Sequence, residues 1–271
     1  MRSFEDKVAV VTGAASGIGR ALAQDLARRG ADLALVDVSA AALAETAERC
    51  VASGRRVTTH VVDVADAARM EALAAEVMAQ HGRVELLVNN AGVSVTGTFE
   101  EQSLDDMHWI VGVNFWGVVH GCKFFLPHLR KAREAHIVNL SSMFGLIGLP
   151  TQSSYCATKF AVRGLSEALW AELRGSGIGV TSVHPGGVKT NIVRDSRTAD
   201  PDAKQKLIEQ FDRLAMSPDK AAAKILRAVE RDRLRVVICP ESRAADWAKR
   251  FFPAAVHHLV ARGYRRFGSL G

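Results

Sequence analysis

Short β-branched segments alternate with longer segments of helical periodicity along the chain, and this alternation constrains the fold more than any other feature. Strands are expected at residues 8–11, 32–36, 56–61, 86–88, 136–140, 180–183 and 235–238. Helices are expected at residues 17–29, 40–53, 66–81, 103–130, 154–174 and 218–230. Because strands that alternate with helices are joined by right-handed crossovers, the pattern predicts an α/β fold. It is a single doubly wound (Rossmann) domain, with a seven-stranded, mostly parallel sheet and helices on both faces.

Size and composition agree with one folded α/β domain. The chain has 271 residues, of which 48% are hydrophobic and 24% charged, close to ordinary globular averages. These values exclude a disordered chain, a collagen-like repeat and a small disulfide-stapled protein. The four cysteines are far apart in sequence and form no CxxC pair, which favours reduced thiols: Cys50, Cys122, Cys156 and Cys239. With no HExxH motif or His/Cys cluster in the sequence, we expect no metal site.

The formal net charge of +6 is concentrated towards the C-terminus. We expect residues 1–240 to form the catalytic domain, with the polar segment at about 189–217 as a substrate lid. Residues 241–271 would then be a basic, amphipathic C-terminal extension. Amphipathic tails most often pack on their own protein, so we expect no membrane contact through this one. No nucleic-acid-binding motif is present and the charged start is unlike a signal peptide, so we expect a cytoplasmic protein that binds no nucleic acid.

A glycine-rich turn links the first expected strand to the first expected helix. Glycines at such a turn allow positive φ angles and let backbone N–H groups approach a pyrophosphate. The residues expected to contact the cofactor there are Gly13, Ser16, Gly17, Ile18 and Gly19. Asp37 ends the second strand, where a carboxylate can bind ribose hydroxyls and repel a 2′-phosphate. The alternatives are an ordinary glycine turn and a helix N-cap, but together the features favour NAD over NADP.

Tyr155 and Lys159 are four residues apart in an expected helix and therefore share one face. An ammonium group near a phenol favours the phenolate, so we expect Lys159 to lower the pKa of Tyr155. A pair with this spacing is also common on protein surfaces. Ser142 lies just past an apolar strand, where its hydroxyl would reach the carboxyl edge of the sheet, and ligands bind there in this architecture.

With these motifs in order, the sequence resembles the short-chain dehydrogenase/reductase family from residue 7 to about residue 238. The matching motifs are Thr12–Gly19, Asp63-Val64, Asn89-Asn90-Ala91-Gly92, Asn114, Ser142, Tyr155 with Lys159, and Pro185-Gly186. The resemblance implies that Tyr155 is the general acid/base and that Ser142 binds the same substrate oxygen. It further implies that Lys159 holds the nicotinamide ribose and that Asn114 positions a proton-relaying water. Asn114 could instead merely satisfy buried backbone groups. Further cofactor contacts implied are Asp63, Val64, Asn90, Pro185, Val188 and Thr190.

The sequence therefore predicts an oxidoreductase that transfers a hydride between NAD(H) and an alcohol or ketone. An apolar secondary alcohol or ketone is expected because few charges occur at the anticipated pocket positions Val93, Met143, Phe144 and Leu149. The alternative is a non-catalytic NAD-binding sensor or scaffold protein of the same fold. The two longest helices carry extra apolar surface, and the resemblance implies that they pair with a second subunit. We expect a homodimer or homotetramer with Trp116 and Ala168 in the interface.

Overall fold

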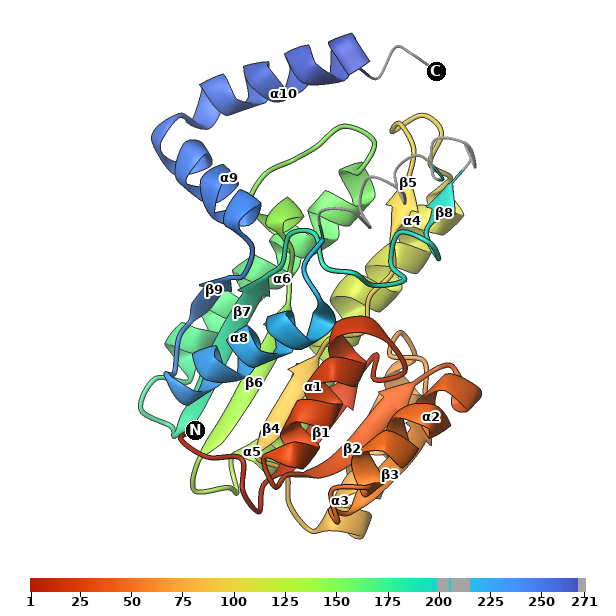
Figure 1. Cartoon of the computed structure of the whole chain (residues 1–271), viewed down its shortest axis with the longest axis vertical. Coiled ribbons are helices and arrows are strands. Elements are labelled where there is room, and N and C mark those ends of the chain that lie inside the picture. The colour runs from red at the N-terminus through yellow and green to blue at the C-terminus, as the bar shows by residue number, and fades with distance from the viewer. Residues whose placement is uncertain (199–204, 206–214, 268–271) are drawn as a thin grey trace.

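The computed structural model describes residues 1–198, 205 and 215–267, and its centre is one parallel sheet (Figure 1). The seven strands have the order β3-β2-β1-β4-β6-β7-β9, and all neighbouring pairs are parallel. Their bounds are β1 Val8–Thr12, β2 Asp32–Asp37, β3 Val57–Val61, β4 Leu86–Asn89, β6 Ala135–Leu140, β7 Ile178–His184 and β9 Arg235–Val237. The fold predicted from the sequence is confirmed, with every strand found within two residues of its expected bounds.

Helices cover both faces of the sheet (Figure 1). One face packs against α1 (Gly17–Arg28), α2 (Ala40–Val51) and α8 (Pro218–Glu230). The other face packs against α3 (Ala67–His81), α5 (Gly117–Leu129) and α6 (Ser153–Glu172). Because both faces are covered, the central strands β1, β4 and β6 are buried along their whole length. This double burial explains their continuous apolar sequences.

The single helix expected at residues 103–130 is interrupted. α4 (Leu104–Val111) and α5 are joined by a π-helical turn, Gly112–Trp116, that adds one wide turn to the helix. Such turns are inserted where a side chain must be redirected, and this one carries the fully buried Asn114. By length and composition residues 104–129 could cross a membrane, and half of their most apolar 18-residue window is buried inside the protein.

Two short strands, β5 (Val95–Thr96) and β8 (Arg197–Thr198), pair in parallel beyond the carboxyl ends of the main strands. β8 belongs to the segment expected to form a substrate lid. Within that segment, residues 199–204 and 206–214 lie outside the described residues. Its first described part runs from Lys189 to Thr198 and ends in β8, next to β5, and Met216 near its other end forms a bridge with Val188.

The C-terminal extension forms two helices, α9 (Pro240–Phe251) and α10 (Pro253–Phe267). Asp246 anchors α9 to the domain through a short ion pair with Arg235 of β9, and it also pairs with Arg250 within α9 at 3.4 Å. α10 continues past α9 and lies away from the sheet (Figure 1). The tail therefore packs on its own domain mainly through α9, less than the sequence led us to expect.

Candidate active site

The glycine turn between β1 and α1 leaves the start of α1 open. Gly13 and Gly17 have φ angles of 66° and 52°, a region that side chains with a Cβ rarely occupy. A Cβ on Gly19 would stand 2.0 Å from the Gly13 carbonyl oxygen, so only glycine fits there. Ser16 is the N-cap residue of α1, yet its side chain accepts no capping hydrogen bond. The first-turn N–H groups of α1 are thus available to an anion such as a pyrophosphate.

The Asp37 carboxylate is fixed next to this turn. One oxygen accepts from the Ala15 backbone N–H at 2.9 Å and the other from the Ser39 N–H at 3.1 Å. Sequence reasoning missed Arg20, the cation closest to the turn, whose guanidinium donates to the Ala15 carbonyl and, at 2.9 Å, to the Thr46 hydroxyl. Arg20 does not line the pocket, whereas Asp37 does.

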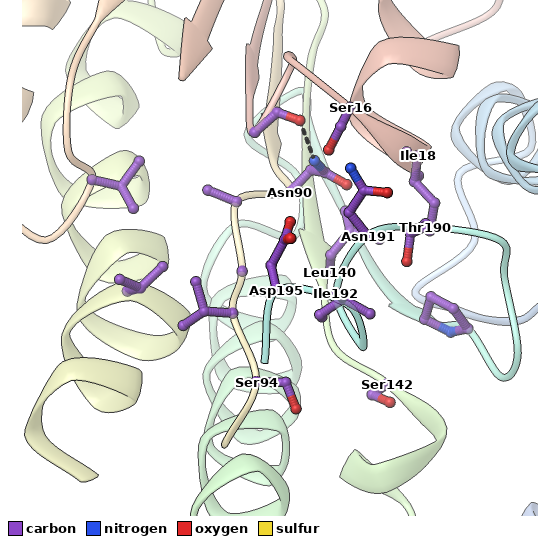
Figure 2. Close-up of a pocket in the computed structure, with 18 of the residues that line it drawn as sticks. Ser16, Ile18, Asn90, Ser94, Leu140, Ser142, Thr190, Asn191, Ile192 and Asp195 are labelled. Atoms are coloured by element: carbon purple, nitrogen blue, oxygen red, sulfur yellow. Dashed lines mark hydrogen bonds between the residues drawn. The ribbon is translucent and has the colours of Figure 1, made fainter. Parts of the chain in front are cut away.

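The Asn90 side chain is turned towards the glycine turn (Figure 2). Its amide nitrogen donates to the carbonyls of Thr12 at 2.9 Å and Gly13 at 3.1 Å. The same residue lines the pocket, so any ribose contact falls to its remaining side-chain oxygen. The Asp63 side chain accepts a hydrogen bond from the Ala65 N–H at 2.9 Å. Asp63 and Val64, both expected from the sequence to contact the cofactor, line the pocket.

The structure brings Ser142, Tyr155 and Lys159 together at the carboxyl ends of β6 and β7. Ser142 follows β6, and α6 presents Tyr155 and Lys159 on one face, with the Lys159 amine 5.5 Å from the Tyr155 ring centre. The Lys159 amine donates to the Leu140 carbonyl at 3.0 Å. The Phe144 ring meets the Tyr155 ring edge-on at 5.9 Å and screens it from solvent.

Burial controls the protonation of this pair. It raises the pKa of the Tyr155 phenol to about 12, against which a hydrogen bond from Ser142 acts in the lowering direction. It lowers the pKa of the Lys159 ammonium to about 8. The sequence predicted that Lys159 would lower the pKa of Tyr155; in this structure the net direction is upward, and the lowering contribution comes from Ser142. Burial destabilises the phenolate by removing its hydration, and this effect is larger than the stabilisation by the hydrogen bond from Ser142.

Asn114 is fully engaged with its surroundings. Its side-chain oxygen accepts from the Val93 N–H at 2.8 Å, and its nitrogen donates to the Val93 carbonyl at 2.9 Å and the Thr158 hydroxyl at 3.3 Å. This is the backbone-satisfying role that the sequence left open. An ideal Cβ on Gly92 would also lie 3.3 Å from the Asn114 oxygen and 3.4 Å from the Lys159 amine. The two polar atoms therefore border the same small space.

Two hydrogen bonds from the end of β7 hold the peptide between Ser142 and Met143, and the sequence did not predict them. The Nδ1 atom of buried His184 is 3.0 Å from the Ser142 carbonyl, and Met143 N–H donates to the Pro185 carbonyl at 2.7 Å. The His184 Nε2 atom is 3.1 Å from the Ser182 hydroxyl. Burial lowers the pKa of His184 to about 4, so the ring is neutral near pH 7. The sequence signal was a histidine at the end of a strand, directly before Pro-Gly.

The remaining wall comes from the segment after β7. Thr190 packs against the glycine turn, since a Cβ on Gly17 would stand 2.8 Å from its methyl group, and Figure 2 shows Thr190 and Asn191 beside Ile18. Across the pocket, Val93 lines the cavity as predicted. Met143, Phe144 and Leu149 are not among its lining residues, so their contact with a substrate stays a prediction. Other members of the wall are Ser94, Trp109, Val113, Pro185, Val188, Ile192 and Asp195.

The cleft has a volume of about 420 Å³, within the usual range for small-molecule sites. It runs from the glycine turn and Asp37 at one end to Ser142, Tyr155 and Lys159 at the other. Most of the predicted cofactor-binding and reaction-centre residues therefore line one continuous space; Gly19 and Asn114 lie outside its lining. Among the described residues, no three His, Cys, Asp or Glu side chains are grouped so as to hold a metal ion.

Comparisons with known proteins agree with this arrangement. The family described as short chain dehydrogenase matches residues 7–201. A Mycobacterium tuberculosis protein named as the oxidoreductase SadH is 45% identical, with 98% of each chain covered. Meso-2,3-butanediol dehydrogenase of Serratia marcescens is 41% identical over 70% of this chain and 74% of its own. A Burkholderia phymatum short-chain dehydrogenase/reductase crystallised with NAD has a TM-score of 0.86 and 34% identity, with coverage of 92% of this chain and 95% of its own.

Proposed function

Because this chain belongs to the short-chain dehydrogenase family, we propose that it transfers a hydride between NAD(H) and an alcohol or ketone. The observation that carries the proposal is the convergence of Ser142, Tyr155 and Lys159 at the end of the cleft that begins at the glycine turn. Such a cleft would place a dinucleotide bound at the glycine turn next to the acid/base group of Tyr155. A non-catalytic NAD-binding protein would need only the cradle.

In the proposed reaction, the Tyr155 hydroxyl exchanges a proton with the substrate oxygen. The Ser142 hydroxyl donates a hydrogen bond to that oxygen and holds it within reach of the phenol. Bound NAD supplies the hydride acceptor, and its positive nicotinamide ring favours the phenolate when an alcohol is oxidised. Lys159 contributes a second positive charge 5.5 Å from the Tyr155 ring.

Proton exchange with solvent is assigned to the space beside Gly92. The Lys159 amine and the Asn114 oxygen both border that space. A water there would have two polar partners and could carry a proton from the lysine outwards. His184 acts as a positioning residue, because its hydrogen bond to the Ser142 carbonyl orients the peptide that carries the serine hydroxyl.

NAD is the proposed cofactor because of the charges at the adenosine end. The Asp37 carboxylate is held by two backbone N–H groups, so it cannot readily turn away from a 2′-phosphate. The guanidinium of Arg20 is engaged behind the turn with the Ala15 and Ala42 carbonyls. It is therefore poorly placed to neutralise that phosphate.

The proposed substrate is a small to medium, fairly apolar secondary alcohol or ketone. Val93, Trp109, Val113 and Ile192 supply apolar wall on the open side of the cleft, whereas Ser94 and Asp195 supply polar wall. The name of the Serratia relative refers to a secondary diol, which agrees with a substrate that carries a hydroxyl next to an apolar chain.

The test is a panel of secondary alcohols with NAD and ketones with NADH, followed by the absorbance of NADH. We expect turnover with at least one apolar alcohol or ketone. We expect none with carboxylic acids of the same chain length, which lack the reacting alcohol or ketone group. If the protein binds NADH tightly but turns over no alcohol or ketone on the panel, the proposal of a dehydrogenase is contradicted and the non-catalytic alternative is favoured.

A further inference from the structure

The C-terminal arm, defined as residues 240–267 of α9 and α10, presents aromatic side chains to solvent. Trp247 and Phe251 are each 63% exposed and Phe252 is 64% exposed. The first two rings stack face to face at 5.4 Å, so they form a continuous apolar surface. Large aromatic residues seldom stay exposed together unless another surface covers them.

The arm is also cationic. It contains six arginines and lysines but two acidic residues, Glu241 and Asp246. Both acids are engaged with the domain: Glu241 accepts from the Gly187 N–H at 3.0 Å, and Asp246 is buried against Arg235. The exposed surface of the arm therefore combines aromatic rings with positive charge, as at Arg262, whereas Arg250 is paired with Asp246 at 3.4 Å.

A surface of the opposite kind lies at the start of α4. We define the acidic patch as residues 99–106, which hold four acidic residues and no lysine or arginine. Phe99 and Leu104 are each 71% exposed and stand between exposed Glu100, Glu101 and Asp105. Arg197 neutralises only Asp106, at 2.9 Å. The acidic patch thus exposes two large apolar side chains that neighbour exposed carboxylates in sequence.

From this complementarity we propose that the C-terminal arm of one copy of this chain docks on the acidic patch of a second copy. Both surfaces lie beyond the carboxyl ends of the strands (Figure 1). In this contact the aromatic rings of the arm would cover the apolar side chains of the acidic patch. The cations of the arm would lie next to the carboxylates of the patch. A two-fold axis would let both copies make the contact at once.

Docking on the acidic patch would also reach the cleft. α4 carries Trp109, which lines the pocket, and the Arg197 guanidinium of β8 lies 3.6 Å above the Trp109 ring while it pairs with Asp106. An arm bound over residues 99–106 would therefore brace the wall formed by α4 and β8. The partner copy would complete the substrate side of the site.

Cysteine cross-linking between copies tests the proposal on the full chain. All four native cysteines are buried, so a surface cysteine can be labelled selectively. An untagged Leu259→Cys copy, changed in the arm, is co-expressed with a tagged Leu104→Cys copy, changed in the acidic patch, and treated with a short bismaleimide. The control pairs Leu259→Cys with Val51→Cys, which is 54% exposed but lies at the other edge of the sheet, at the end of α2.

We expect a product of about twice the 29.2 kDa chain mass, at least about tenfold more abundant for the arm and patch pair than for the control. Charge reversal adds a second measurement. Arg262→Glu in the arm, or Glu100→Lys with Asp105→Lys in the patch, should each lower the yield about fivefold or more. Co-expressing the reversed arm with the reversed patch should restore it.

Three outcomes would overturn the proposal. One is a yield no higher than that of the control. A second is a yield that the reversals leave unchanged. The third is efficient cross-linking within a single chain that carries both cysteines at high dilution, because the arm would then bind its own patch. If the cross-link is absent and the protein binds vesicles of anionic phospholipid instead, the occupant is a membrane and not a second copy.

Discussion

Replacing Asp37 with asparagine should move the cofactor preference from NAD towards NADP. Two unit charges about 4 Å apart repel by about 1 kcal/mol in water and by about 4 kcal/mol near a protein surface. Asp37 is half-buried, so the cost of a 2′-phosphate should fall between these limits. Since about 1.4 kcal/mol is a factor of ten, the wild-type preference for NAD should lie between about fivefold and several hundredfold.

Asparagine is the informative replacement because it keeps one carbonyl oxygen for the Ala15 N–H, which Asp37 accepts at 2.9 Å. The ratio of kcat/KM for NADP to that for NAD should rise at least about tenfold in Asp37→Asn, mostly through a better kcat/KM with NADP. Asp37→Ala should weaken both cofactors, because the Ala15 and Ser39 N–H groups lose their acceptor.

Asp63→Asn is the matched control. Asp63 also lines the cleft and accepts a backbone N–H at 2.9 Å, but from Ala65 and not from the glycine turn. It should therefore leave the ratio of the two cofactors almost unchanged. Wild-type protein that uses NADP as well as NAD, or an Asp37→Asn ratio equal to that of wild type, would refute the electrostatic reasoning.

Three further predictions concern protonation and assembly. With the pKa of Tyr155 raised to about 12, kcat/KM for alcohol oxidation should increase from pH 7 to pH 10 as the phenolate fraction grows, and a pH-independent rate would contradict this. Burial lowers the pKa of His184 from 6.5 to about 4, so between these pH values the unfolded chain binds a proton at this residue that the folded chain does not. Up to about 3 kcal/mol of the free energy of unfolding should therefore be lost as the pH falls from 6.5 to 4. Urea unfolding should show a shallower loss in His184→Gln, and an equal loss would exclude His184 as the cause. Trp116, 49% exposed, is expected in a subunit interface, so Trp116→Glu should lower the mass found by light scattering towards 29.2 kDa, and a wild-type protein that is already monomeric would disprove that interface.

The sequence predicted the strands well because the fold places them between two layers of helices. Strands such as β1, with five consecutive buried residues, need β-branched apolar side chains on both faces, and that pattern is visible in one sequence. The π-helical turn at Gly112–Trp116 was missed, since one extra residue in a helix hardly changes the apolar periodicity. Asn114 was nevertheless identified, through its family motif.

The sequence predicted which residues form the site better than it predicted their pKa values and hydrogen bonds. Tyr155 and Lys159 were found from their spacing, but the pKa of Tyr155 moves upwards because burial outweighs the hydrogen bond from Ser142, and a linear pattern contains no measure of burial. The hydrogen bond between His184 and the Ser142 carbonyl joins residues 42 positions apart. Only the three-dimensional register of β6 and β7 reveals such a contact.

Replacement of the Tyr155 hydroxyl tests the central proposal most directly. Tyr155→Phe removes one oxygen atom and keeps the ring that packs edge-on against Phe144 at 5.9 Å, so the fold and the cofactor cradle should survive. With the best alcohol from the panel, kcat should fall by about 10²- to 10⁴-fold while the Kd for NADH stays within about threefold of wild type. A variant that keeps more than about a tenth of the wild-type kcat while binding NADH normally would show that Tyr155 is not the proton-transfer group.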